Sequence, residues 1–77
     1  MAFFLLVYDQ AAGKVIRLTE YSDADQDAGL QARFDLELQH RLEPNIEVVL
    51  LGARDEETLR ETHGRYFKTV GELIANG

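Results

Sequence analysis

The sequence has no cysteine, one proline and only six glycines, and these shortages limit the chemistry open to it. Without cysteine there can be no disulfide, no thiol nucleophile and no zinc-thiolate site. The glycines are scattered and never form the cluster that a phosphate-binding loop requires. The composition, 45% hydrophobic and 29% charged, is otherwise globular, so we expect one ordered domain, 1–77, with no cofactor and no metal.

Long apolar runs and excess basic charge are missing as well. The longest apolar run, Phe3 to Tyr8, is much shorter than the roughly 20 residues that cross a bilayer, and no signal-peptide pattern surrounds it. We therefore expect a soluble, cytoplasmic protein with no membrane partner. Fourteen Asp and Glu against eight Lys and Arg give a charge of -6, and the basic residues are spread along the chain. This balance disfavours binding to nucleic acid.

Three short segments predict strands. Residues 2–8 are apolar at both odd and even positions, which is typical of a central strand covered on two faces. The stretch from Asp9 to Gly13 favours a tight turn, and the mixed pattern of 14–21 is typical of an edge strand. Residues 46–51, IEVVLL, are β-branched and apolar and predict the third strand.

The segment from Ala24 to Leu42 predicts a helix, although its apolar residues also fall at even positions, the period of a strand. It contains no Val, Ile or Thr and would be unusually long for a strand. Read as a helix, it carries two apolar stripes, a larger one of Leu30, Phe34, Leu38 and Leu42, and a shallower one of Ala28, Ala32 and Leu36. This wide apolar arc indicates a helix that contacts more than one surface.

A second helix is predicted to begin at Asp55, which is a good N-cap followed by acidic residues, and to run to the C-terminus. A break near Gly64 is an alternative, because glycine weakens a helix interior. The predicted fold is a small α+β domain of order ββαβα, with a three-stranded antiparallel sheet of order 2-1-3 and two helices. This order places the most apolar strand in the centre.

The stretch SDADQDAGL, residues 22–30, resembles the start of a calcium-binding loop. Counted from Asp23, however, the position that needs glycine holds Ala28, and the position that needs glutamate holds Phe34. The stretch is better explained as the start of the helix, with Ser22 or Asp23 as its cap. An acidic patch remains, where a basic protein partner would bind: Glu20, Asp23, Asp25 and Asp27.

Two histidines raise the question of a site. Glu37 and His40 have the Glu-x-x-His spacing of di-iron bundles, but a second such pair is lacking. His63 lies with Tyr66 on the apolar stripe of the second helix, either as a pocket acid or base or as a packed structural residue. Arg54, in the turn that begins at Gly52, is a candidate for binding a small anion.

The sequence does not specify a catalytic constellation, so the first hypothesis is a non-enzymatic interaction or dimerisation module. We expect a homodimer formed through the second helix and the unprotected third strand, with contacts from Phe67, Val70, Val48 and Leu50. One alternative is a ligand-binding or enzymatic site at His63, Tyr66 and Arg54. Another is an acidic inhibitor that mimics nucleic acid through the acidic patch.

Overall fold

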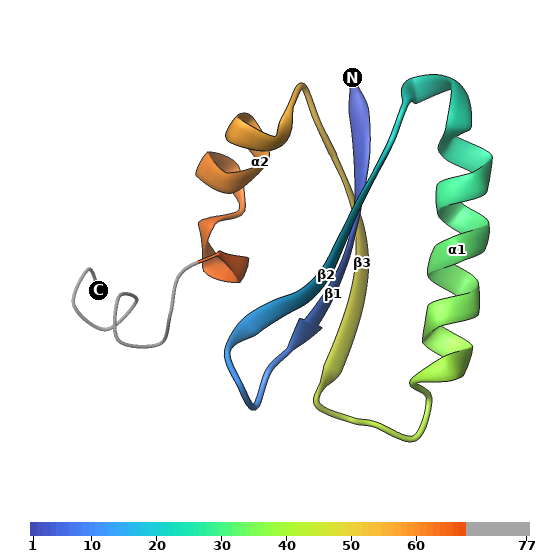
Figure 1. Cartoon of the computed structure of the whole chain (residues 1–77), viewed down its shortest axis with the longest axis vertical. Coiled ribbons are helices and arrows are strands. Elements are labelled where there is room, and N and C mark those ends of the chain that lie inside the picture. Colours follow the sequence, from blue (N-terminus) through green and yellow to red (C-terminus); the bar gives the residue numbers. More distant parts are fainter. Residues whose placement is uncertain (68–77) are drawn as a thin grey trace.

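The computed structural model describes residues 1–67 and confirms the predicted order of elements (Figure 1). Each strand is followed by the element that the sequence predicts, and the two helices lie on opposite sides of the sheet. The elements are β1 (Ala2–Asp9), β2 (Lys14–Tyr21), a 3-10 turn η1 (Asp23–Asp25), α1 (Gln26–Gln39), β3 (Ile46–Ala53), α2 (Glu56–Thr62) and a 3-10 turn η2 (Gly64–Tyr66).

The sheet has the order β2-β1-β3, and both pairings are antiparallel. β1 lies in the centre because it is apolar at nearly every position and so suits a strand covered on both faces. Its residues from Phe4 to Tyr8 are all buried. Both β2 and β3 are therefore edge strands.

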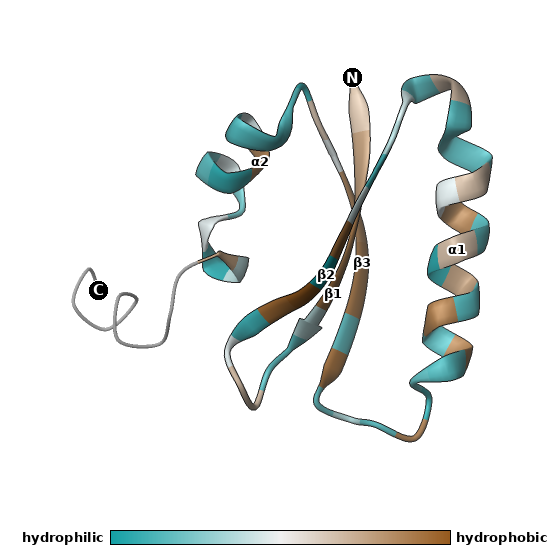
Figure 2. Cartoon of the chain, viewed as in Figure 1, coloured by the Kyte–Doolittle hydropathy of each residue, from teal (hydrophilic) through white to brown (hydrophobic). Residues whose placement is uncertain are grey.

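Each face of the sheet has its own apolar cluster, because successive side chains of a strand point to opposite faces. One cluster lies on the α2 side: Ala2, Phe4, Leu6, Tyr8, Ala53, Leu59 and Tyr66. The other lies on the α1 side, where Leu5, Val7 and Leu36 are surrounded by Tyr21, Ala32, Ile46, Val48 and Leu50. Figure 2 shows the apolar residues concentrated in the strands and recurring along α1.

The turn between β1 and β2 is fixed by Asp9 and Gly13. The Asp9 carboxylate accepts hydrogen bonds from the backbone N–H groups of Ala11 and Ala12, each at 3.0 Å. Gly13 has a φ of 69°, a conformation that suits glycine, and its N–H bonds to the Asp9 carbonyl at 2.7 Å. Beyond the turn, Tyr8 pairs with Val15 but Val7 pairs with Arg17, so Ile16 is the extra residue of a β-bulge.

Both helices are shorter than the sequence predicts. α1 ends at Gln39, after which the Arg41 N–H bonds to the Leu38 carbonyl, three residues back instead of four, so Leu42 lies in the following turn and is 84% exposed. α2 ends at Thr62, and a 3-10 turn begins at Gly64, so the continuous helix is wrong and the alternative break is confirmed. The predicted apolar positions after Phe67, including Val70, lie outside the described residues.

Candidate functional site

The outward face of α1 carries three large apolar side chains that the rest of the described chain leaves about half exposed. Leu30, Phe34 and Leu38 are 45%, 59% and 48% exposed. They recur every four residues and so form one continuous row along the helix, which we call the outer stripe of α1. This run of exposed apolar side chains makes the outer stripe the first candidate for an interaction surface.

The opposite face of α1 packs on the sheet through smaller side chains. Gly29 and Leu36 are buried, and Ala32 packs against the cluster on this side. A Cβ atom on Gly29 would lie 3.4 Å from side chains of β2 and β3, so helix and sheet are in close contact there. At about 100° per residue, Phe34 points about 160° away from both Ala32 and Leu36. The sheet thus covers Ala32 and Leu36 of the shallower predicted stripe, while Ala28 is exposed and the larger stripe faces solvent.

The two ends of the outer stripe differ in charge. All four residues of the acidic patch, Glu20, Asp23, Asp25 and Asp27, are exposed, and the three aspartates lie in η1 and the first turn of α1. At the other end, the Arg41 guanidinium donates a hydrogen bond of 3.4 Å to the Leu38 carbonyl. Within residues 1–67, Arg41 takes part in no ion pair.

The stretch SDADQDAGL forms η1 and the start of α1. The Ser22 hydroxyl donates to a carboxylate oxygen of Asp25 at 3.0 Å, and neither this side chain nor that of Asp25 caps a backbone N–H of the helix. Capping of α1 by Ser22 or Asp23 is therefore wrong: Asp23 begins η1, Ser22 precedes it, and Asp25 occupies the N-cap position of α1. Across residues 1–67, no three His, Asp or Glu side chains meet in a group suited to a metal ion.

Glu37 and His40 have different partners. Glu37 accepts a hydrogen bond of 2.7 Å from Arg33 Nε, and His40 Nδ1 lies 2.8 Å from a carboxylate oxygen of Glu43. The His40 side chain is only 18% exposed and lines a cleft that reaches Ile46 on β3. Glu37 and His40 thus contact different side chains and are not arranged as a two-residue metal site.

Tyr66 is the best-connected residue of the group that the sequence singled out. Its hydroxyl donates a hydrogen bond of 2.8 Å to Glu47, whose other carboxylate oxygen accepts one of 3.1 Å from Gln10. These bonds, with that of Tyr66 foremost, hold the pKa of Glu47 below its ordinary value. Burial, reinforced by the Glu47 carboxylate, raises the pKa of Tyr66. The Tyr66 ring also packs edge-on against Tyr8, with centroids 5.1 Å apart, so this group anchors η2 to the sheet.

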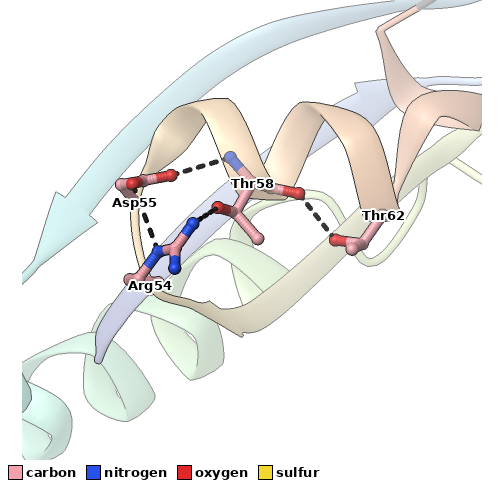
Figure 3. A network of polar contacts seen from close by, with 4 residues as sticks. All are labelled: Arg54, Asp55, Thr58 and Thr62. Carbon is pink, nitrogen blue, oxygen red and sulfur yellow. Dashed lines mark hydrogen bonds and ion pairs between the residues drawn. The ribbon is translucent and has the colours of Figure 1, made fainter.

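Arg54 and His63, which the sequence groups with Tyr66, lie at opposite ends of α2. The Arg54 side chain, 83% exposed, lies 3.6 Å from the Asp55 carboxylate and 3.4 Å from the Thr58 hydroxyl (Figure 3). His63 is half-buried and follows the last turn of the helix. The Tyr66 N–H donates a hydrogen bond of 3.1 Å to the His63 carbonyl, but within residues 1–67 no side-chain hydrogen bond or ion pair joins Arg54, His63 and Tyr66. A ligand site shared by the three stays a prediction.

A groove of about 410 Å³ runs beside β2 on the α2 side of the sheet. Three of its lining residues, Lys14, Arg17 and Arg60, are basic, and no lining residue is acidic. The fold thus gathers basic residues that look dispersed in the sequence. The rest of the lining is mainly apolar: Gly13, Val15, Ile16, Leu18, Tyr66 and Phe67.

The residues predicted to form a dimer interface are already engaged within the chain. Val48 and Leu50 pack against the cluster beneath α1. Phe67 packs against the cluster on the other face, and the Arg60 guanidinium lies 4.5 Å from its ring centroid. Val70 lies outside the described residues. A dimer through these residues stays a prediction.

Comparisons with protein-family models, with curated proteins and with solved structures gave no match to this chain. Within residues 1–67, the helices are too short and too polar to cross a membrane. The function of the chain must therefore be argued from its surfaces.

Sequence reasoning missed the importance of Glu47 and of the groove, and it left open which stripe of α1 is covered. Glu47 is the one charged residue in an otherwise apolar strand. Because a charge in such a strand needs a hydrogen-bond partner, its position could have predicted a contact such as that with Tyr66. The groove had no signal of this kind, because its walls come from segments more than 40 residues apart.

Proposed function

We propose that this chain is a non-enzymatic interaction module that forms a homodimer through the outer stripe of α1. The observation that carries the proposal is the exposure of Leu30, Phe34 and Leu38 on the side of the helix turned away from the sheet. An uninterrupted apolar row on a helix surface is the usual form of a helix-pairing interface. The sequence also predicts a homodimer, but through β3 and α2, whereas the interface proposed here lies on α1.

The free energy gained by burying the outer stripe sets the expected affinity of the dimer. Full burial of a Leu or Phe side chain is worth about 1.5–3 kcal/mol, and about half of that remains available at each position of the outer stripe. Three such side chains on each protomer contribute about 4.5–9 kcal/mol per dimer. The loss of translational and rotational freedom costs at least about 4 kcal/mol. Even the upper end of this gain leaves a surplus of about 5 kcal/mol, so we expect a weak dimer with a dissociation constant no tighter than about 0.2 mM.

Charge favours an antiparallel arrangement of the two helices. A parallel pair would bring together the aspartates of both N-terminal ends, at Asp23, Asp25 and Asp27. An antiparallel pair with its two-fold axis at Phe34 places this acidic end beside the partner's Arg41. It also opposes the two helix dipoles.

The first test is Phe34→Glu, measured by sedimentation equilibrium from about 10 µM to about 1 mM. Wild-type protein should approach twice the 8.7 kDa mass of one chain, and the variant should remain at that mass. Gln39→Glu is the matched control, because it adds the same charge at an exposed position of α1 outside the outer stripe. A wild-type mass of one chain at every concentration would refute the homodimer and leave the stripe to a different protein.

Exchanging the charges of Asp27 and Arg41 tests whether the two helices of the dimer are antiparallel. Asp27→Arg and Arg41→Asp should each weaken the dimer severalfold, because each places like charges opposite one another in the antiparallel pair. The double variant should recover most of the wild-type affinity, since the opposite charges face each other again. Additive losses in the double variant would contradict the antiparallel pairing.

A further inference from the structure

The groove beside β2 lies on the opposite side of the sheet from α1, so its role is separate from the proposed dimer. Six consecutive residues of the hairpin, from Gly13 to Leu18, line it. Successive side chains of a strand point to opposite faces, so a lining that includes all of them must follow the backbone along the edge of the strand. The groove is thus open to the edge of β2 as well as to one face.

The β2 edge has backbone groups available for pairing. β2 pairs only with β1, and no strand of the described chain lies on its other side. The N–H and C=O groups on that side are available for one further strand. The bulge at Ile16 leaves this side chain 47% exposed at the groove, where an incoming strand would contact it.

The charge of the groove selects among possible strands. In a protein of charge -6, the groove is lined by three basic residues and by no acidic residue. Arg60 is held in place by Glu56 at 3.2 Å and by the ring of Phe67. Within residues 1–67, Lys14 and Arg17 have no acidic side chain at ion-pair distance.

We propose that this groove binds an extended acidic peptide, which adds to the edge of β2 as a fourth strand. Its backbone pairs with β2, its carboxylates meet Lys14, Arg17 and Arg60, and its apolar side chains contact Val15, Ile16 and Phe67. Backbone pairing supplies the affinity for an extended chain, and the basic lining selects acidic sequences. The binding site is complete in one protomer.

The test uses the full chain and a synthetic peptide of about eight residues in which glutamate and valine alternate, a length typical of one strand. Binding is followed by ¹⁵N NMR and calorimetry at low salt. The backbone N–H signals of Lys14 to Leu18 should shift and become protected from hydrogen exchange. Three further probes complete the experiment: a peptide with glutamine in place of glutamate, the same acidic peptide with alternate backbone nitrogens methylated, and a single-stranded oligonucleotide.

Each probe and variant has a decisive outcome. The glutamine and methylated peptides should bind at least about fivefold more weakly, and Lys14→Glu and Arg17→Glu should each weaken the acidic peptide about fivefold. Arg33→Glu, the matched control on α1, should leave binding unchanged. Equal binding of the methylated peptide or of the oligonucleotide would show general anion attraction and overturn the proposal. Lack of binding to the full chain would also overturn it.

Discussion

The hydroxyl of Tyr66 contributes more to this fold than its position near the end of the described chain suggests. It joins η2 to β3 through Glu47, a contact between residues 19 positions apart. Because the bond involves an ionised carboxylate at a partly buried position, it should contribute about 1–2 kcal/mol to the free energy of unfolding. Of the residues that the sequence singled out in this region, Tyr66 is the one that is buried.

Tyr66→Phe and Glu47→Gln should each lower the free energy of unfolding at pH 7 by about 1–2 kcal/mol. The folded state lowers the pKa of Glu47, so its contribution is present above the unfolded pKa, near 4.3, and is lost as the pH falls. The difference between wild type and Glu47→Gln, measured by urea unfolding, should therefore shrink below about pH 4. A difference that persists unchanged at pH 3 would contradict the role of the carboxylate.

The pKa of Tyr66 is shifted in the opposite direction, with the opposite consequence. Burial raises it, so the folded state favours the neutral hydroxyl, and this contribution is present below the unfolded pKa, about 10. It is lost as the pH rises through the folded value. Wild type should lose stability above about pH 10 by a margin that Tyr66→Phe lacks, as urea unfolding at alkaline pH would measure.

Leu36 and Phe34, two positions apart on α1, should respond very differently to truncation. Leu36 is 8% exposed and packs against the sheet, so Leu36→Ala should cost about 2–3 kcal/mol of unfolding free energy. Phe34→Ala should cost less than about 0.5 kcal/mol at a protein concentration too low for dimers. Thermal and urea unfolding of the two variants would check this, and a large loss in Phe34→Ala would show that the ring packs within its own chain.

At the scale of elements, α2 is a short helix whose start is fixed more firmly than its end. The Asp55 carboxylate accepts a hydrogen bond of 2.8 Å from the Thr58 N–H, the N-cap contact that the sequence predicts (Figure 3). This bond lowers the pKa of Asp55. At the other end, Gly64 follows the cap residue His63, and the helix gives way to a 3-10 turn. The N-cap at Asp55 and the hydrogen bond from Tyr66 to Glu47 together position α2 and η2, which form the wall of the groove opposite β2.

Asp55→Ala should lower the melting temperature, because the first turn of α2 loses its cap. Asp55→Asn should retain most of the stability, since the amide oxygen can accept the same hydrogen bond. Glu57→Ala is the matched control, an exposed acidic residue in the same turn that does not cap the helix. Equal losses in Asp55→Ala and Glu57→Ala, measured by circular dichroism, would point to the helix dipole instead of the cap.

For the whole molecule, the central sheet separates two surfaces of different character. The outer stripe of α1 is apolar with an acidic end, and the groove on the α2 side is basic. A dimer joined through α1 would turn its two grooves away from each other. Such a dimer could hold two acidic segments at once.

Dimerisation through α1 also predicts a concentration-dependent melting temperature. Association stabilises the folded state by mass action, so the wild-type melting temperature should rise between about 10 µM and about 1 mM protein. The melting temperature of Phe34→Glu should not change over the same range. A wild-type value independent of concentration would argue against the dimer as firmly as sedimentation would.

The sequence by itself determined the order of elements, the central position of β1, the turn at Asp9 to Gly13 and the N-cap at Asp55. These features depend on local chemistry and on one apolar strand that must be covered on both faces. Only the tertiary structure decided which stripe of α1 packs on the sheet, because both stripes are apolar and the close approach at Gly29 selects the smaller side chains. It alone also brought Arg60 beside β2, since a groove between distant segments leaves no periodic pattern in either of them.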